Sequence, residues 1–252
     1  MMTRKPPRKT VIFFGADGTG KTTQVTLLLK EFRRRGLKAR KAWIRARHSL
    51  SYIISQLLIK LGYRSTLTTQ NNHKTKILDP RTLPAKWLWS LLEFVSVLPW
   101  IITRLYIPLL QGYYVVAERY VIDTIVYNQY FIGRSFNTYA KILLRMIPKD
   151  ALLIHLDAYR QDVFKRRKGE ILSENFIDYQ LKQYRHIASQ LNALSINTSD
   201  RCVEAVSKII SKAYESDVSR YRVDEPARTQ RLLPHRSNGQ ILRKQRTTTT
   251  YT

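Results

Sequence analysis

The chain has 252 residues, 44% of them hydrophobic, which is enough length and apolar content for one sizeable core. Its single cysteine, Cys202, excludes a disulfide framework, and the first ten residues carry charge and proline where a secretory signal would carry an apolar run. Both features predict a cytoplasmic protein.

The formal net charge is +26, a value typical of proteins that meet nucleic acid or an anionic surface. Much of the excess lies in residues 1–9, in the run 33–47 and in residues 218–252. We predict a basic disordered head at 1–9 and a basic disordered tail at 218–252, because neither shows apolar periodicity. Solvated charge explains most such runs, so we expect only weak, non-specific contact with nucleic acid or an anionic surface.

Short apolar runs alternate with helical patterns from residue 10 to residue 217, which we predict to be one domain. The expected strands lie at 10–14, 38–44, 113–117, 151–156 and 194–197. The expected helices lie at 22–35, 49–61, 84–110, 120–132, 139–147, 174–193 and 203–214. Short apolar strands separated by helices indicate an α/β fold whose parallel sheet is covered on both faces.

Two segments in the middle of the chain need separate interpretation. Residues 62–82 are polar and without period, and we predict a long surface insertion or mobile loop there. The run 87–111 is apolar, but charged residues leave it no stretch of the ~18–20 residues that a spanning helix needs. We predict no transmembrane segment and a buried helix kinked at Pro99, while contact with a membrane surface stays open as an alternative.

The glycine-rich stretch GADGTGKT at residues 15–22 matches the pattern G-x-x-x-x-G-K-[ST] between an apolar strand and a helix. In such a loop the backbone wraps phosphates, Lys21 reaches the β and γ oxygens, and Thr22 ligates Mg²⁺. A glycine-rich turn that matches by chance is the alternative. The predicted ATP-binding residues are Gly15, Ala16, Asp17, Gly18, Thr19, Gly20, Lys21, Thr22 and Thr23.

A second candidate group follows the predicted strand at 113–117. Glu118 and Arg119 would lie at the carboxyl edge of the sheet, where open α/β sheets bind ligands. An acid there can hold the water shell of Mg²⁺, and an arginine can grip a second phosphate group. We predict Thr22 and Glu118 as the metal-binding residues; a strand-end ion pair is the alternative.

The third group is a basic segment that Asp157 opens after the fourth predicted strand. It reads DAYRQDVFKRRKGE and carries four consecutive basic residues at 165–168. Phosphoryl transfer depends on positioning and charge neutralisation, so a mobile helical lid at about 157–172 is expected to bring guanidinium groups to the phosphates. A solvated basic face is the alternative.

Together these pieces resemble the thymidylate kinase family of P-loop nucleoside monophosphate kinases, over residues 11 to 210. The resemblance is carried by the loop with its internal acid, by Glu118-Arg119-Tyr120, by Tyr127 and by Leu156-Asp157. It implies a three-layer P-loop NTPase fold, with a five-stranded parallel sheet flanked by helices and a helical lid. The implied reaction converts MgATP and dTMP into ADP and dTDP.

The resemblance also implies roles for single residues. Asp17 would face the acceptor nucleotide and bind its sugar hydroxyl. Because the loop contains no arginine, the catalytic arginine would lie in the lid, so the predicted catalytic residues are Lys21, Arg166 and Arg167. The predicted acceptor-binding residues are Asp17, Arg45, Arg47, Phe94, Arg119 and Tyr127. A homodimer formed by helices outside the sheet is implied as well.

Several positions depart from the family. Leu98 replaces a phosphate-binding arginine, while Asp123 and Asn128 replace a Ser/Thr and a Gln near the base. The arginines that would compensate for Leu98 are Arg45, Arg47 and Arg104. Two alternatives stay open: a related phosphotransferase with a changed acceptor, and a nucleic-acid-associated NTP-binding protein with little turnover, whose binding falls steeply with salt.

The histidines and the tryptophans of the apolar helix receive no functional role. His48, His155 and His186 lack metal-ligand spacing, and we expect His155, inside a predicted strand, to be a core residue. Trp87, Trp89 and Trp100 are expected to belong to the core, with at most one in a base pocket.

Overall fold

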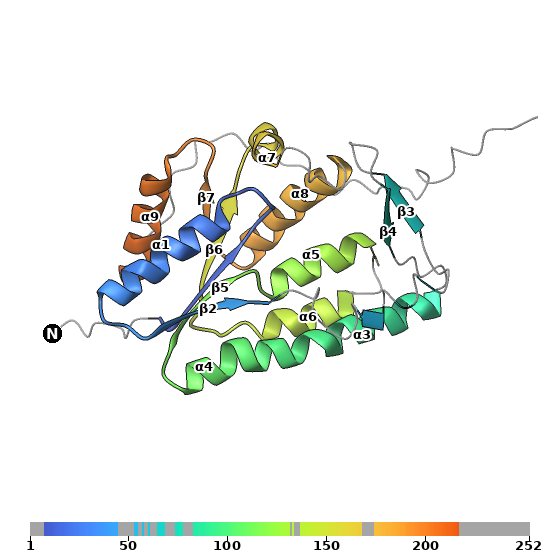
Figure 1. Ribbon diagram of the computed structural model, residues 1–252, viewed down its shortest axis with the longest axis horizontal. Coiled ribbons are helices and arrows are strands. Elements are labelled where there is room, and N and C mark those ends of the chain that lie inside the picture. Colours follow the sequence, from blue (N-terminus) through green and yellow to red (C-terminus); the bar gives the residue numbers. More distant parts are fainter. Residues whose placement is uncertain are drawn as a thin grey trace, which may run out of the picture. The chain divides into compact units, whose positions relative to one another are not determined.

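The computed structural model describes residues 8–44, 53, 54, 57, 60, 65–68, 74–77, 83–131, 133, 137–167 and 174–216. Its main sheet has five parallel strands in the order β2-β5-β1-β6-β7. These strands are β1 (Thr10–Phe14), β2 (Ala39–Trp43), β5 (Tyr114–Glu118), β6 (Leu152–Asp157) and β7 (Leu194–Asn197). Helices cover both faces of the sheet (Figure 1). The predicted α/β fold and all five predicted strands are confirmed.

The helices agree with the predicted ranges to within a few residues at each end. They are α1 (Lys21–Arg34), α3 (Leu83–Ile101), α4 (Ile107–Leu110), α5 (Val121–Phe131), α6 (Asn137–Arg145), α7 (Arg160–Arg166), α8 (Glu174–Gln190) and α9 (Val203–Glu215). Of the predicted helix at 49–61, four residues are described and all four are helical. The lid segment 157–172 is described as far as residue 167 and contains α7.

Side chains of β1 alternate between two buried clusters, as the period of two in a strand requires. Val11 and Phe13 pack with α1 and α9, whereas Ile12 and Phe14 pack with α3, α5, α6 and α8. All five residues of β1 are buried. The sheet is therefore the middle of three layers, as expected.

The strand order creates a switch point at the carboxyl end of β1. From β1 the chain leaves toward β2 on one side of the sheet, and from its neighbour β6 it leaves toward β7 on the other. In open α/β sheets ligands bind at such a point, outside the carboxyl ends of the strands. Three segments meet there: the loop 15–20, the end of β5 at Glu118, and the end of β6 at Asp157.

The segment 62–82, predicted to be a surface insertion or a mobile loop, contains regular structure. Two short antiparallel strands, β3 (Ser65–Thr68) and β4 (Lys74–Ile77), pair within it. The segments STLT and KTKI are rich in β-branched residues, which favour strands even where the overall composition is polar.

The apolar helix is not buried on all sides, which corrects the prediction of a core helix. One helical run, Lys86–Leu110, has the length and composition to cross a membrane, yet only 33% of its most apolar window is buried. Pro99 lies inside α3, and a π-helical turn, η2 (Ile102–Tyr106), follows it and leads into α4. Proline lacks the N–H for a helical hydrogen bond, and a π turn is one way in which a helix absorbs that defect.

Candidate functional site

The glycine loop, residues 15–20, connects the end of β1 to the start of α1. Gly15, Gly18 and Gly20 all have positive φ, a region that side chains other than glycine rarely adopt. At Gly15 a Cβ would also lie 2.2 Å from the carbonyl oxygen of Leu156, so the loop packs directly on the end of β6. Glycine is therefore needed in this loop both for the positive φ angles and, at Gly15, for the close approach of the backbone to Leu156.

The hydroxyl of Thr19 is used inside the glycine loop, since it donates to the Ala16 carbonyl at 2.8 Å. The N-cap residue of α1 is Gly20, which has no side chain to cap the first turn. The first N–H groups of a helix lack partners within the helix and carry a partial positive charge. The start of α1 is thus suited to an anion that reaches Lys21, Thr22 and Thr23.

Lys21 extends back under the loop from the first position of α1. Its ammonium donates to the carbonyls of Gly15 and Ala16, both at 2.7 Å, and lies 3.8 Å from the Asp17 carboxylate. Burial lowers the pKa of Lys21, while the nearby Asp17 acts in the opposite direction. A buried ammonium with one carboxylate near it is suited to an additional anionic partner.

Glu118, at the end of β5, carries the strand-end carboxylate of the site. Its Oε1 accepts a hydrogen bond from the Thr22 hydroxyl, and its Oε2 forms an ion pair with Lys41 of β2. Burial acts to raise the pKa of Glu118, but the hydrogen bonds from Lys41 and Thr22 outweigh it and the pKa is lowered. The carboxylate is therefore ionised at neutral pH and touches the residue predicted to share a metal with it.

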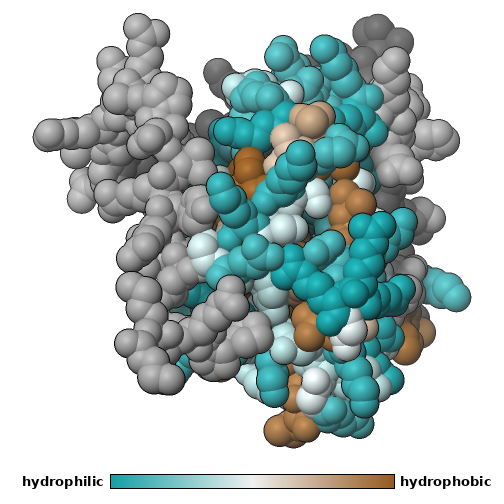
Figure 2. Space-filling view, turned by 90° about the vertical axis from the view of Figure 1, so that its left-hand side faces the viewer, coloured by the Kyte–Doolittle hydropathy of each residue, from teal (hydrophilic) through white to brown (hydrophobic). Residues whose placement is uncertain are grey.

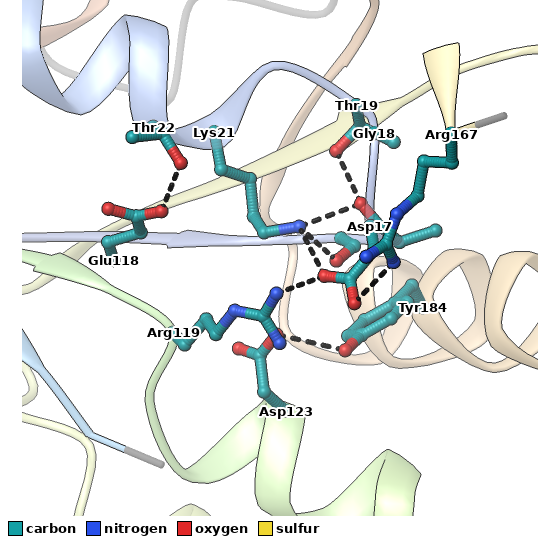
Figure 3. Close-up of polar contacts among 12 residues, drawn as sticks. Asp17, Gly18, Thr19, Lys21, Thr22, Glu118, Arg119, Asp123, Arg167 and Tyr184 are labelled. Atoms are coloured by element: carbon teal, nitrogen blue, oxygen red, sulfur yellow. Dashed lines mark hydrogen bonds and ion pairs between the residues drawn. The ribbon is translucent and has the colours of Figure 1, made fainter. Parts of the chain in front are cut away.

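Asp17, in the middle of the glycine loop, forms ion pairs with cations from three different elements (Figure 3). Arg119 follows β5 and pairs with Oδ1, and Arg167 from the lid lies 2.8 Å from Oδ2. Lys21 is the third cation, at 3.8 Å from Oδ1. The acid thus supplies the shared counter-charge that allows these cations to gather at one place.

Arg119 has a strained backbone that is fixed on both sides. Its φ is 65°, an uncommon value for a residue other than glycine. Its N–H donates to Phe13 of β1, and its carbonyl accepts from the N–H of Ile44 after β2. Strain of this kind persists where the surroundings impose it, often at functional sites. Burial acts to lower the pKa of Arg119, but Asp17 raises it overall, so this cation is permanent.

The lid approaches the glycine loop through two arginines. Arg166 donates to the Gly18 carbonyl at 3.2 Å and to the hydroxyl of Thr198 at 3.2 Å, whereas Arg167 reaches Asp17. The side chain of Arg167 also passes close over Gly18, where a Cβ would lie 3.1 Å from its Cγ. Both predicted catalytic arginines therefore contact the loop.

Asp123, predicted to lie near a base, is buried in the first turn of α5. Its carboxylate accepts hydrogen bonds from the Tyr120 N–H at 3.2 Å and from the Tyr184 hydroxyl at 2.9 Å. Burial raises the pKa of Asp123, although Lys21 and Arg119 act to lower it. Its hydrogen bonds make it a support of the site's charged centre.

His155 supports the site from below as a core residue, as expected. Its ring stacks on Phe14 with centroids 5.3 Å apart, and its Nδ1 lies 3.1 Å from the Ser195 hydroxyl. Burial lowers the pKa of His155 to about 4, so the ring is neutral at neutral pH.

Of the remaining predicted acceptor residues, those that the structure describes contact aromatic side chains. The ring of Phe94 stacks on Tyr139 at 5.3 Å, and Tyr127 packs with Phe131 and Phe176. Leu98 packs against the core. Arg45 and Arg47 lie outside the described residues.

Arg104 and Asn128 also have surroundings that the sequence did not reveal. The exposed guanidinium of Arg104 lies 4.8 Å from the Trp100 ring. Asn128 is buried, and among the described residues its side-chain nitrogen has no hydrogen-bond partner. A buried amide without a partner costs stability and calls for an explanation.

Three contributors to the site were missed by sequence reasoning. Lys41 holds Glu118, Tyr184 of α8 holds Asp123, and Thr198 after β7 holds Arg166. Each lies far along the chain from the group it contacts, and only the strand order brings them together. A basic residue within a polar edge strand is the one signal that pointed toward Lys41.

Comparison with known proteins adds no assignment: no protein-family model and no curated protein matches the chain. Within the part of the chain that the structure describes, no group of three or more His, Cys, Asp or Glu side chains is placed to hold a metal ion. Mg²⁺ sites that use one or two protein oxygens together with phosphate oxygens do not need such a group.

Proposed function

We propose that the protein is an ATP-dependent nucleoside monophosphate kinase that converts dTMP to dTDP, with a P-loop NTPase fold and membership of the thymidylate kinase family. One observation carries the proposal. The loop lysine Lys21, the strand-end arginine Arg119 and the lid arginine Arg167 converge on a single carboxylate, Asp17, at the switch point of a parallel sheet.

The donor phosphates of ATP would lie over the glycine loop. The uncapped start of α1 offers N–H groups, and the buried ammonium of Lys21 offers charge. Backbone donors and a helix N-terminus favour a phosphate chain over an uncharged ligand. Lys21 would shift from the loop carbonyls to the β and γ oxygens of the bound nucleotide.

Thr22 and Glu118 fit a magnesium ion by the chemistry of their oxygen atoms. A hydroxyl and an ionised carboxylate already in contact are hard ligands of the kind that Mg²⁺ prefers. When bound, Mg²⁺ neutralises charge on the phosphates. Lys41 would keep Glu118 ionised and oriented.

The acceptor nucleotide would lie on the other side of Asp17. The Asp17 carboxylate would accept a hydrogen bond from the sugar hydroxyl, and Arg119 would hold the acceptor phosphate. An ion pair between the two groups holds both in place before binding, and positioning of this kind lowers the entropic cost of reaction.

In the reaction, an oxygen of the acceptor phosphate bonds to the γ-phosphorus while the bond from that phosphorus to the β–γ bridging oxygen breaks. Lys21, Arg166 and Arg167 would stabilise the charge that spreads over the transferring group. Their contacts to Gly15, Gly18 and Asp17 support this role, because they hold the cations around the loop.

A changed acceptor is the second candidate. It is favoured by Leu98, which packs against the core where the family has a phosphate-binding arginine, and by Phe94, whose ring stacks on Tyr139.

ADP formation from MgATP tests both candidates, with dTMP, dUMP, dCMP, CMP, UMP, AMP and GMP as acceptors and with Lys21→Ala as the blank. Turnover highest with dTMP supports the first candidate, and turnover highest with another nucleotide supports the second. Turnover at the level of the blank with every nucleotide would contradict kinase activity.

A further inference from the structure

Apolar side chains line the outer side of the helical run α3–η2–α4. This apolar stripe consists of Leu88, Leu91, Val95, Ile102, Ile107 and Leu110, which are between 41% and 87% exposed. Most of its steps match the helical repeat, and the step of five residues from Ile102 to Ile107 crosses the π turn. The extra residue of that turn keeps Ile107 and Leu110 on the exposed side.

The opposite side of the same run is fixed to the fold. Val97, Ile101 and Leu105 are at most 1% exposed and belong to the core cluster beneath the sheet. Figure 1 shows the run lying lengthwise along one edge of the helical layer. Because one side of this helix packs in the core, it cannot cross a bilayer without exposing the core. A partner that covers the stripe must therefore contact the helix along its length.

The charged residues around the stripe are almost all basic. Arg104 is exposed on η2, and Lys141 and Arg145 are exposed on α6, which packs against α3 through Tyr139. Among the described residues from 83 to 150, the exposed acid is Asp150; the other acids there are Glu93, Glu118 and Asp123, and they are buried. Basic side chains beside apolar ones are typical of helices that lie in the interface of an anionic membrane.

Tryptophan supports the same interpretation. Trp87, at the start of the run, is 42% exposed, and the Arg104 guanidinium lies over the ring of Trp100. Aromatic rings with a polar edge are enriched where lipid headgroups meet acyl chains. The run therefore presents apolar, aromatic and cationic side chains to solvent along its length.

We propose that the outer side of α3–η2–α4 binds the surface of an anionic lipid bilayer, with the apolar stripe at the acyl boundary and Arg104, Lys141 and Arg145 among the headgroups. A second copy of the chain, as in the homodimer that the resemblance implies, suits this surface less well than an anionic bilayer, because an interface there would gather the same basic side chains from two chains of net charge +26 each. The proposal is independent of the kinase activity.

Vesicle flotation of the full-length protein tests the proposal, using phosphatidylcholine vesicles with and without phosphatidylglycerol. Brominated lipid in the same vesicles reports depth, because three of the four tryptophans, Trp87, Trp89 and Trp100, lie on α3. We expect binding that requires phosphatidylglycerol and is accompanied by quenching of tryptophan fluorescence.

Two variants on opposite faces form a matched pair. Val95 in the stripe and Val203 at the start of α9 are 47% and 44% exposed. We expect Val95→Gln to weaken vesicle binding several-fold and Val203→Gln to leave it unchanged. The triple variant Leu88→Gln, Val95→Gln, Leu110→Gln should weaken vesicle binding about 100-fold or more. A second triple variant, Arg104→Gln, Lys141→Gln, Arg145→Gln, should weaken it about 100-fold at low salt.

Three results would overturn the proposal. The first is no binding to anionic vesicles. The second is binding to anionic vesicles that occurs without tryptophan quenching and is unchanged in the triple stripe variant. Such binding would be assigned to the basic ends of the chain. The third is a dimer in solution, measured by light scattering, that the stripe variant dissociates, since a second copy would then cover the stripe.

Discussion

At the carboxyl edge of the main sheet charged side chains are turned inward and paired, whereas along α3–η2–α4 apolar side chains are turned outward. At the first surface, Asp17 and Glu118 together pair with four cations, from α1, β2, β5 and the lid. At the second, six aliphatic side chains are exposed beside basic ones. The side formed by α1 and α9 resembles neither, since its described surface is mostly hydrophilic (Figure 2).

Each of these two surfaces has an unfavourable contribution to the free energy of the free protein that its own contacts do not offset. Cations that are gathered and partly buried need a nearby anion, and three cations share the single carboxylate of Asp17. Exposing a continuous row of aliphatic side chains requires an apolar cover. The first surface is suited to phosphates and the second to lipid, so changes at one should leave the other function intact.

Lys21→Ala should separate the two surfaces most strongly. Loss of the buried ammonium should lower kcat for phosphoryl transfer about 1000-fold, because its charge at the β and γ oxygens is removed. Vesicle binding should be unchanged. The control is Lys30→Ala, an exposed lysine on the same helix, which should keep full activity; equal rates for the two variants would contradict the role of Lys21.

Acid should destabilise the protein through His155 beneath the carboxyl edge. Its pKa is about 4 in the folded protein and 6.5 when unperturbed, so this contribution is complete above pH 6.5 and is lost as pH falls toward 4. At about 1.4 kcal/mol per pH unit between the two values, about 3 kcal/mol is at stake, and most of it is lost by pH 5.

Urea unfolding at pH 7, 6 and 5 measures this effect. His155→Phe should flatten the decline in the free energy of unfolding, while His186→Gln, at an exposed position on α8, should not. Parallel pH profiles for wild type and His155→Phe would assign the acid sensitivity to other groups.

Arg167→Ala should lower kcat about 100-fold, since one of two lid guanidiniums is removed from the transferring phosphoryl group. Arg167→Lys should recover only part of the rate, because an ammonium cannot match the forked geometry of arginine. The neighbouring Lys165→Ala, exposed on the same helix, serves as the control. If Arg167→Ala kept the wild-type kcat, Arg167 would have no part in the transfer.

Glu118→Gln should have the smallest effect of the four. The amide keeps a polar contact with Thr22 but loses the charge, so we expect about tenfold more Mg²⁺ for half-maximal activity. Titration of kcat/KM with Mg²⁺ measures this directly, with Glu31→Gln on the outer side of α1 as the control. An unchanged Mg²⁺ requirement would remove Glu118 from the metal site.

The centre of the sheet could be predicted because β1, β5 and β6 are short apolar runs between helical patterns, whereas the edge strand β2, ARKAW, gives a weaker signal. The glycine loop was recognised by its spacing, since Gly15 and Gly18 are positions where a side chain would collide or strain the backbone. Contacts across strands could not be predicted in the same way. Lys41 meets Glu118 only because β2 pairs with β5, an order that no local pattern encodes.

The exposure of the outer side of α3–η2–α4 differs from the first expectation, a buried helix, for another reason, although contact with a membrane surface was kept as an alternative. A helix that is apolar on all sides is predicted to be buried, since composition does not reveal which side the sheet covers. The strands β3 and β4 were missed because polarity was weighed above β-branching. Asp17 was predicted to face an acceptor, but its ion pair with Arg167 depends on the lid position, which the sequence does not encode.

The decisive measurement of kinase activity is the transfer of γ-labelled phosphate from ATP to dTMP by the full-length protein, with products separated by chromatography. We expect labelled dTDP with wild type and with the stripe variants, and none above background with Lys21→Ala. Label that stays in ATP, or that appears only as inorganic phosphate, would contradict it.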